Sequence, residues 1–190
     1  MPSLTWRISF VGLIGLAALL VLACGPSGDP ATRGGVIPPA VERPAELAGR
    51  LDLPALVSEV VFPWSEVVVR RDSDDLAVGV LVANTPDRRS RGMMYWSGLP
   101  ADSGMIFIWE ETRARSGGFW NQNVPIDLDV AWLDRDGEIL EFSILLAEDE
   151  TTKRPRQDYF FVLEMPRGRF AEMGIELGHQ VLIPATLLPE

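Results

Sequence analysis

Two aspartates that share one predicted strand are candidates for acid–base chemistry. Asp127 and Asp129 stand at i and i+2 in the stretch 126–134, IDLDVAWLD, which predicts a β-strand. Both carboxylates would then project to the same face, with Cα atoms about 6.6–7 Å apart. Two carboxylates about 5–9.5 Å apart can act as acid and base in glycoside hydrolysis. A solvated strand entrance or an ion pair with arginine fits the same two residues, and we favour this structural use.

A tryptophan followed by three amide side chains is the second candidate. The stretch 120–123 reads Trp-Asn-Gln-Asn and lies just before Pro125, at the expected margin of a sheet. Trp120 would offer a stacking face, and Asn123 with its neighbours would offer paired donors and acceptors, which suits a sugar- or peptide-binding surface. The favoured alternative is a core tryptophan with asparagines that satisfy loop backbone groups.

Arg91 completes this candidate site. It follows a turn that begins at Thr85 and precedes a Gly-Met-Met run, so its guanidinium is expected to lie close to the body of the domain. Asp129 needs a partner where its strand passes from solvated to buried. We therefore predict a guanidinium–carboxylate pair between Arg91 and Asp129, with Trp120 and Asn123 on the same margin of the sheet. The pair would either pin the turn to the strand or leave donors for a small polar ligand.

Composition narrows the classes of function. The 190 residues carry a formal net charge of −10 with no cluster of Lys and Arg, so a nucleic-acid partner is not expected. Cys24 is the single cysteine and His179 the single histidine, which excludes a disulfide framework, a Cys-rich zinc site and a two-His metal motif. The sequence contains no glycine-rich phosphate loop. We therefore expect neither a metal nor a cofactor.

The N-terminal segment predicts export. Residues 8–22 form an apolar run of 15 residues, which corresponds to about 22 Å of helix and suits a signal peptide better than a membrane span. The run ends in Val-Leu-Ala-Cys at 21–24, which resembles the lipobox of bacterial lipoproteins. This resemblance implies that residues 1–23 are removed as a signal peptide. A lipid on Cys24 would then anchor the exported chain to the cell membrane or the outer membrane.

The remaining sequence divides into a linker and one domain. Residues 24–60 start at the lipidated cysteine, and their high proline and glycine content predicts a disordered linker. Residues 61–190 are long enough to bury a core of their own. Apolar runs predict strands at 65–69, 76–83, 104–109, 126–134, 138–142, 158–165 and 180–184, and short helical turns at 86–91 and 169–173. We expect an all-β, mainly antiparallel fold, as a compact β-sandwich or a barrel-like domain.

Three stretches of this domain resemble a known family. Residues 82–109 contain Thr-Pro-x-x-Arg-x-x-Gly and then Leu-Pro-x-x-x-Gly-Met, and residues 119–142 contain Phe-Trp, a Leu-Asp strand and an Asp-Gly turn. With the C-terminal VLEMPRG and GIELGHQV, they resemble the bacterial and archaeal family called domain of unknown function 192. The sequence departs from the family at 121–122, where Met-Lys is usual, and at His179, where Asp is usual. The resemblance implies a compact β-domain, often exported or lipid-anchored, and no established reaction.

These observations lead to one functional hypothesis and one alternative. We expect a lipid-anchored envelope protein whose β-domain binds a ligand or a protein partner, or supports envelope structure, without catalysis. The alternative is an envelope hydrolase that uses Asp127 and Asp129. The ligand-binding candidates are Arg91, Trp120, Asn123, Asp127 and Asp129.

Overall fold

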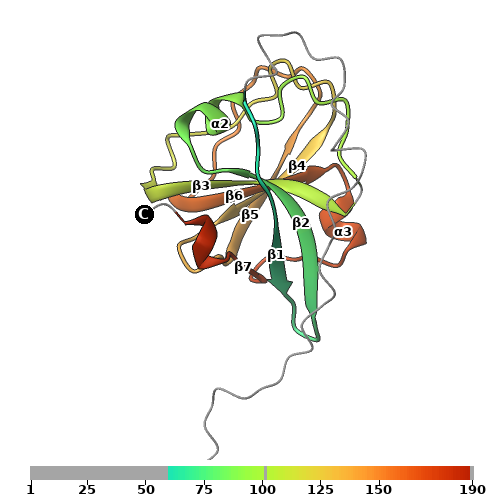
Figure 1. The fold of residues 1–190 in the computed structure, drawn as a ribbon, viewed down its shortest axis with the longest axis vertical. Helices are drawn as coiled ribbons and strands as arrows, with labels where there is room; N and C mark the ends of the chain where they lie inside the picture. Colours follow the sequence, from blue (N-terminus) through green and yellow to red (C-terminus); the bar gives the residue numbers. More distant parts are fainter. Residues whose placement is uncertain (1–59, 101, 189–190) are drawn as a thin grey trace, which may run out of the picture. The chain divides into compact units, whose positions relative to one another are not determined.

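The computed structural model describes residues 60–100 and 102–188. The predicted signal peptide, Cys24 and the linker up to residue 59 lie outside these described residues. One sheet contains the seven strands β1 (Trp64–Arg70), β2 (Asp75–Ala83), β3 (Ser103–Arg113), β4 (Leu128–Leu133), β5 (Ile139–Leu145), β6 (Tyr159–Pro166) and β7 (Gln180–Leu182). Every strand expected from the apolar runs is present, and the all-β, mainly antiparallel fold is confirmed (Figure 1).

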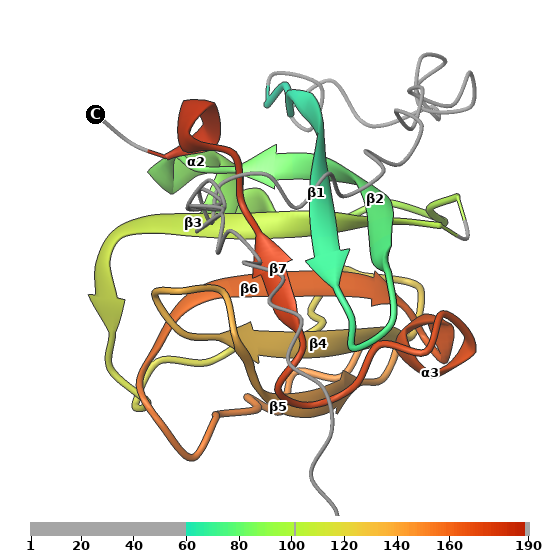
Figure 2. The ribbon, with the colours of Figure 1, turned by 90° about the horizontal axis from the view of Figure 1, so that it is seen from below.

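The sheet is open but strongly curled. Its strand order is β5-β4-β6-β3-β2-β1-β7, and only β2 and β3 pair in parallel. The two edges meet at a single bridge, where Ile139 N–H donates to the His179 carbonyl (2.9 Å) and Val181 N–H donates to the Gly137 carbonyl (2.8 Å). Figure 2 shows β7 passing from the side of β1 towards β5. The domain is therefore barrel-like.

Gly137 makes this closure possible. It ends the Asp-Arg-Asp-Gly turn between β4 and β5 with a φ of +82°, a left-handed conformation that favours glycine. A Cβ atom at this position would lie 2.1 Å from the Val181 carbonyl oxygen. A side chain here would therefore separate the two edges of the sheet.

The parallel connection between β2 and β3 contains α2 (Pro86–Arg91). Thr85 caps this helix, with its hydroxyl accepting the N–H of Arg88, and Pro86 occupies the first turn, where its missing N–H costs nothing. Gly92 ends it at a φ of +47°. The helix predicted from the Thr-Pro-Asp sequence is confirmed.

Apolar side chains form a core on each face of the sheet. Side chains from all seven strands pack in the first core, together with Phe170 of α3 (Arg169–Glu172) and Ile175. The second core lies on the opposite face, where Met93 and Val124 from the connecting segments cover residues of β2 to β6. Along β4 the side chains alternate between the cores, with Leu128, Val130 and Trp132 in the second and Ala131 and Leu133 in the first. This is the alternation that the sequence of the strand predicts.

Helices are few and short. Within residues 60–100 and 102–188, the helical elements are α2, α3 and one 3₁₀ turn, η2 (Ala185–Leu187). Among residues 60–100 and 102–188, no helix is long and apolar enough to span a membrane.

Candidate functional site

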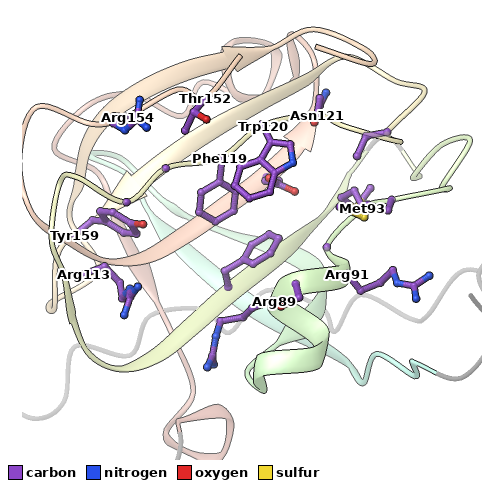
Figure 3. A pocket seen from close by; sticks show the side chains of 18 of the residues that line it. Arg89, Arg91, Met93, Arg113, Phe119, Trp120, Asn121, Thr152, Arg154 and Tyr159 are labelled. Atoms are coloured by element: carbon purple, nitrogen blue, oxygen red, sulfur yellow. The ribbon is translucent and has the colours of Figure 1, made fainter. Parts of the chain in front are cut away.

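A pocket of about 550 Å³ opens on the face of the sheet that carries the second core. Side chains of α2, β3 and β6 line it, together with two connecting segments at 116–124 and 152–154 (Figure 3). Strands supply its floor and the connecting segments supply its outer wall. The pocket is therefore built by segments that are far apart in the sequence.

Backbone hydrogen bonds join the two connecting segments into one wall. Phe119 N–H donates to the Lys153 carbonyl (3.0 Å), and Lys153 N–H returns a bond to the Phe119 carbonyl (2.8 Å). Gly118 allows this approach, because a Cβ atom there would lie 2.3 Å from the Lys153 carbonyl oxygen. The wall depends on a residue without a side chain at this point.

Asn121 fixes the same wall to the sheet. Asn121 is only 1% exposed, and its side-chain Nδ2 donates to the backbone carbonyls of Ile126 (3.0 Å) and Leu145 (3.2 Å). These bonds join the segment 116–124 to the end of β5 and to the residues before β4. Asn121 therefore has the backbone-satisfying role that was the favoured alternative for this stretch.

Aromatic rings make the interior of the pocket apolar. Phe119 packs edge-to-face on Phe107 at a centroid distance of 4.8 Å and on Trp132 at 5.4 Å. Tyr159 packs edge-to-face on Trp132 (4.9 Å) and on Trp109 (5.6 Å). Burial raises the pKa of the Tyr159 hydroxyl, and the neighbouring Arg113 opposes this rise. The rings that line the pocket, those of Phe107, Trp109, Phe119 and Tyr159, provide surfaces for an apolar or aromatic ligand, while Trp132 supports them from beneath.

Four arginines surround the pocket: Arg89, Arg91, Arg113 and Arg154. Figure 3 shows them on different sides of the opening, with Phe119 and Trp120 between them. Arg89 and Arg113 lie over the ring of Trp109, 5.7 and 5.9 Å from its centroid. Burial lowers the pKa of Arg89, and Glu110 partly opposes this effect.

Arg89, Arg113 and Arg154 keep part of their donor capacity. Arg89 Nη1 donates to the Ile108 carbonyl (2.8 Å) and Arg154 Nε to the Ser116 carbonyl (3.0 Å), which orients both guanidinium groups. Within the described residues, Arg89, Arg113 and Arg154 form no salt bridge. No carboxylate of the described residues therefore lies within salt-bridge distance of these three guanidinium groups.

Among the described residues, Glu164 is the only acidic one that lines the pocket. It lies on β6 between Met105 of β3 and Val130 of β4, both fully buried, and is itself only 3% exposed. Its carboxyl group makes no hydrogen bond or ion pair with any described residue. Burial alone raises the pKa of Glu164 to about 8, because the charged form has lost its water.

The predicted site residues are divided between this pocket and the rest of the domain. Arg91 and Trp120 line the pocket, and Trp120 is 47% exposed rather than a core residue. Asn123 lies beside the pocket wall, at a φ of +59°, with its carbonyl accepting the N–H of Tyr95 (2.7 Å). The structure therefore brings Arg91 and Trp120 to one pocket, with Asn123 in the adjoining turn.

The predicted Arg91–Asp129 pair is wrong. Asp129 projects to the face of the first core, opposite to the pocket, and its Oδ2 accepts the N–H of Gly168 (2.7 Å). Asp127 precedes β4, and its Oδ1 accepts the N–H of Ala147 (2.8 Å). Each aspartate satisfies the backbone of a different loop, and this arrangement does not favour the hydrolase hypothesis. Across the described residues, no three His, Cys, Asp or Glu side chains lie close enough to hold a metal ion.

Sequence reasoning missed Glu164 and three of the arginines. A signal for Glu164 was present, because it is a charged residue inside the apolar run Tyr-Phe-Phe-Val-Leu-Glu-Met, and buried acids are rare without a reason. Arg89, Arg113 and Arg154 come from three separate segments. Their convergence depends on the strand order and on the bridge at Phe119, which local patterns do not reveal.

Comparison with known proteins agrees with this architecture. The model of the family DUF192, described as "Uncharacterized ACR", matches residues 67–183. A crystal structure of a candidate transcription regulator from Sinorhizobium meliloti 1021 is similar at 26% identity and a TM-score of 0.61, covering 65% of this chain and 96% of that one. A protein of unknown function from Novosphingobium aromaticivorans DSM 12444 is similar at 22% identity and a TM-score of 0.57, covering 69% and 99%. No curated protein matches the sequence.

Proposed function

This chain belongs to DUF192, a family of uncharacterised proteins, and since membership assigns no reaction, we propose a function from the pocket itself. The domain is a non-catalytic binding module for a small organic anion with an apolar or aromatic body. The anionic group would meet the arginines around the opening, and the body would lie against the aromatic side chains.

The distribution of charge carries this proposal. The chain has 27 acidic and 17 basic residues, yet the pocket is lined by four arginines and one acid. A concave site whose walls include aromatic side chains concentrates the field of such charges and raises the local concentration of an anion. Guanidinium groups also match the geometry of carboxylates and phosphates. The aromatic side chains Trp109, Phe119 and Trp120 supply the surface for the body of the ligand.

Binding of 4-methylbenzoate tests this proposal. We expect calorimetric titration of the full-length chain in detergent to show binding. We expect Arg113→Gln and Arg154→Gln to weaken it about three- to tenfold each, because each removes a charged donor at a partly exposed site. Arg135→Gln is the matched control, since Arg135 is exposed in the β4–β5 turn and does not line this pocket. Absence of binding, or equal losses in all three variants, would contradict an anion pocket.

The cellular location of the protein is the second part of the proposal. We propose that residues 1–23 are a signal peptide, that a lipid on Cys24 anchors the exported chain to the cell membrane or the outer membrane, and that residues 25–60 separate the anchor from the domain. The apolar run 8–22 and its Val-Leu-Ala-Cys ending support this. Two or more acyl chains hold a protein durably on a bilayer, whereas a single chain does not. An envelope ligand or protein would then be the natural partner.

Replacement of Cys24 tests the anchor. Cys24→Ser is expected to abolish incorporation of labelled palmitate and cleavage after residue 23, because the thiol is the group that receives the lipid. Ser27→Ala, three residues further on, should leave both unchanged. Metabolic labelling followed by gel electrophoresis measures both effects, and a labelled Cys24→Ser chain would refute the lipobox assignment.

A further inference from the structure

The carboxyl group of Glu164 is built into the floor of the pocket without a partner. It lies between two fully buried side chains, Met105 and Val130, on the face that carries the second core. Buried polar groups are nearly always hydrogen-bonded, and those that are not call for an explanation. The described residues supply none of its hydrogen bonds, so its partner must be a molecule that enters the pocket, either water or a ligand with a donor group.

The pocket combines arginines around its opening with a buried carboxyl group in its floor. The arginines come from α2, the end of β3 and the segment 152–154, around the opening. Glu164 lies on β6 in the floor, and burial alone accounts for its raised pKa. Apolar side chains of Phe107, Phe119 and Val124 line the same pocket. A ligand that spans it would meet cations around the opening and a carboxyl group in the floor.

We propose that the pocket takes an amphoteric ligand, whose ammonium group pairs with Glu164 while its anionic group meets the arginines. This inference rests on the proposed anion pocket and names the class of ligand: a small amino acid-like zwitterion with an apolar or aromatic body. An ammonium group suits the floor because it donates to a carboxylate and because aromatic ring faces attract cations. No other charged side chain lines the floor of the pocket among the described residues.

Pairing with an ammonium group has a consequence for protons. Glu164 enters the complex with its proton bound near neutral pH and pairs with the cation as a carboxylate, so the proton leaves to solvent. The other charged or titratable groups that line the pocket are Arg89, Arg91, Arg113, Arg154 and Tyr159. The arginines stay charged and the pKa of Tyr159 is raised by burial, so Glu164 is the group that releases the proton.

Two probes that differ by one amine test the inference. 4-(Aminomethyl)benzoate and 4-methylbenzoate share the ring and the carboxylate. We expect calorimetry of the full-length chain to show that the amine tightens binding about tenfold or more, the usual worth of a hydrogen-bonded charge pair. In Glu164→Gln the ratio of the two affinities, with and without the amine, should fall to about one. Glu176→Gln is the control, since Glu176 is exposed on the other face and should leave the ratio as in the wild type.

Proton release gives an independent readout. Titrations at pH 7 in two buffers of different ionisation enthalpy should show close to one proton released with 4-(aminomethyl)benzoate and none with 4-methylbenzoate. Equal affinities of the wild type for both probes, or a ratio that survives in Glu164→Gln, would overturn the inference and leave the anion pocket intact. Binding of neither probe would overturn both.

Discussion

Glu164→Gln is expected to stabilise the folded domain by about 5 kcal/mol above pH 8. The carboxyl group is buried without a partner, and burial raises its pKa from 4.5 to about 8. The unfolded chain releases this proton near pH 4.5, whereas the folded chain holds it up to about pH 8. Between these values the unfolded state binds fewer protons, so the free energy of unfolding falls as pH rises, by about 1.4 kcal/mol per pH unit. Glutamine keeps the shape of the protonated acid and carries no such dependence.

The pH profile separates this effect from a change in packing. Chemical unfolding of both proteins at pH 4, 6 and 8.5 should give equal stabilities at pH 4 and a widening advantage for Glu164→Gln above it. At pH 8.5 the melting temperature should differ by on the order of 10 °C. Glu176→Gln, at an exposed position, should follow the wild type at every pH. An advantage of Glu164→Gln that is the same at pH 4 and pH 8.5 would show that the carboxyl group is not held neutral by burial.

A stability gain of this size has a bearing on function. Residues that reduce stability and persist are often those that a binding site requires. Because Glu164→Gln is expected to fold better than the wild type, a loss of ammonium recognition in this variant cannot be ascribed to unfolding. The stability measurement tests whether the carboxyl group of Glu164 is buried and neutral, and the binding measurement tests whether it recognises an ammonium group.

The strands were predictable because their patterns are local. The alternation of Leu128, Val130 and Trp132 against Ala131 and Leu133 predicts both β4 and the two cores that it separates. The helix α2 was predictable from Thr85 and its neighbours for the same reason. Each of these elements is determined by residues a few positions apart.

The prediction that Arg91 pairs with Asp129 was wrong because such a pair requires both residues to lie on the same face of the sheet. Asp129 was expected to need a partner as burial increases, and it has one, but the partner is the backbone N–H of Gly168. Backbone donors cannot be recognised from residue types. The parity of β4 also places Asp129 on the face opposite to Leu128 and Val130, which are the residues nearest to the pocket side. The sequence does not show on which face of the sheet the pocket opens, and the prediction needed this information.

Asn121→Ala is expected to destabilise the domain by about 3–5 kcal/mol. Its Nδ2 donates to the buried carbonyl of Leu145 and to the part-buried carbonyl of Ile126, and a buried acceptor left without a donor costs about 1–3 kcal/mol. Loss of the buried side chain adds a small cavity. Denaturant unfolding measures the change. Gln122→Ala is the matched control, because the neighbouring Gln122 is exposed and makes only a long contact to Glu150 (3.4 Å), so its loss should cost less than about 0.5 kcal/mol.

Asn121→Ala should also weaken the pocket, for a reason that differs from that of the arginine variants. The same residue donates its backbone N–H to the Asp149 carbonyl (2.8 Å), so it joins the segment 116–124 to the segment that follows β5, two residues beyond the bridge at Phe119. Freeing this segment would displace Phe119 and Trp120, which lie against the opening (Figure 3). We therefore expect 4-methylbenzoate to bind more weakly even at temperatures where the variant is folded. Stability lost with unchanged binding would show instead that the wall is held by the Phe119–Lys153 bridge alone.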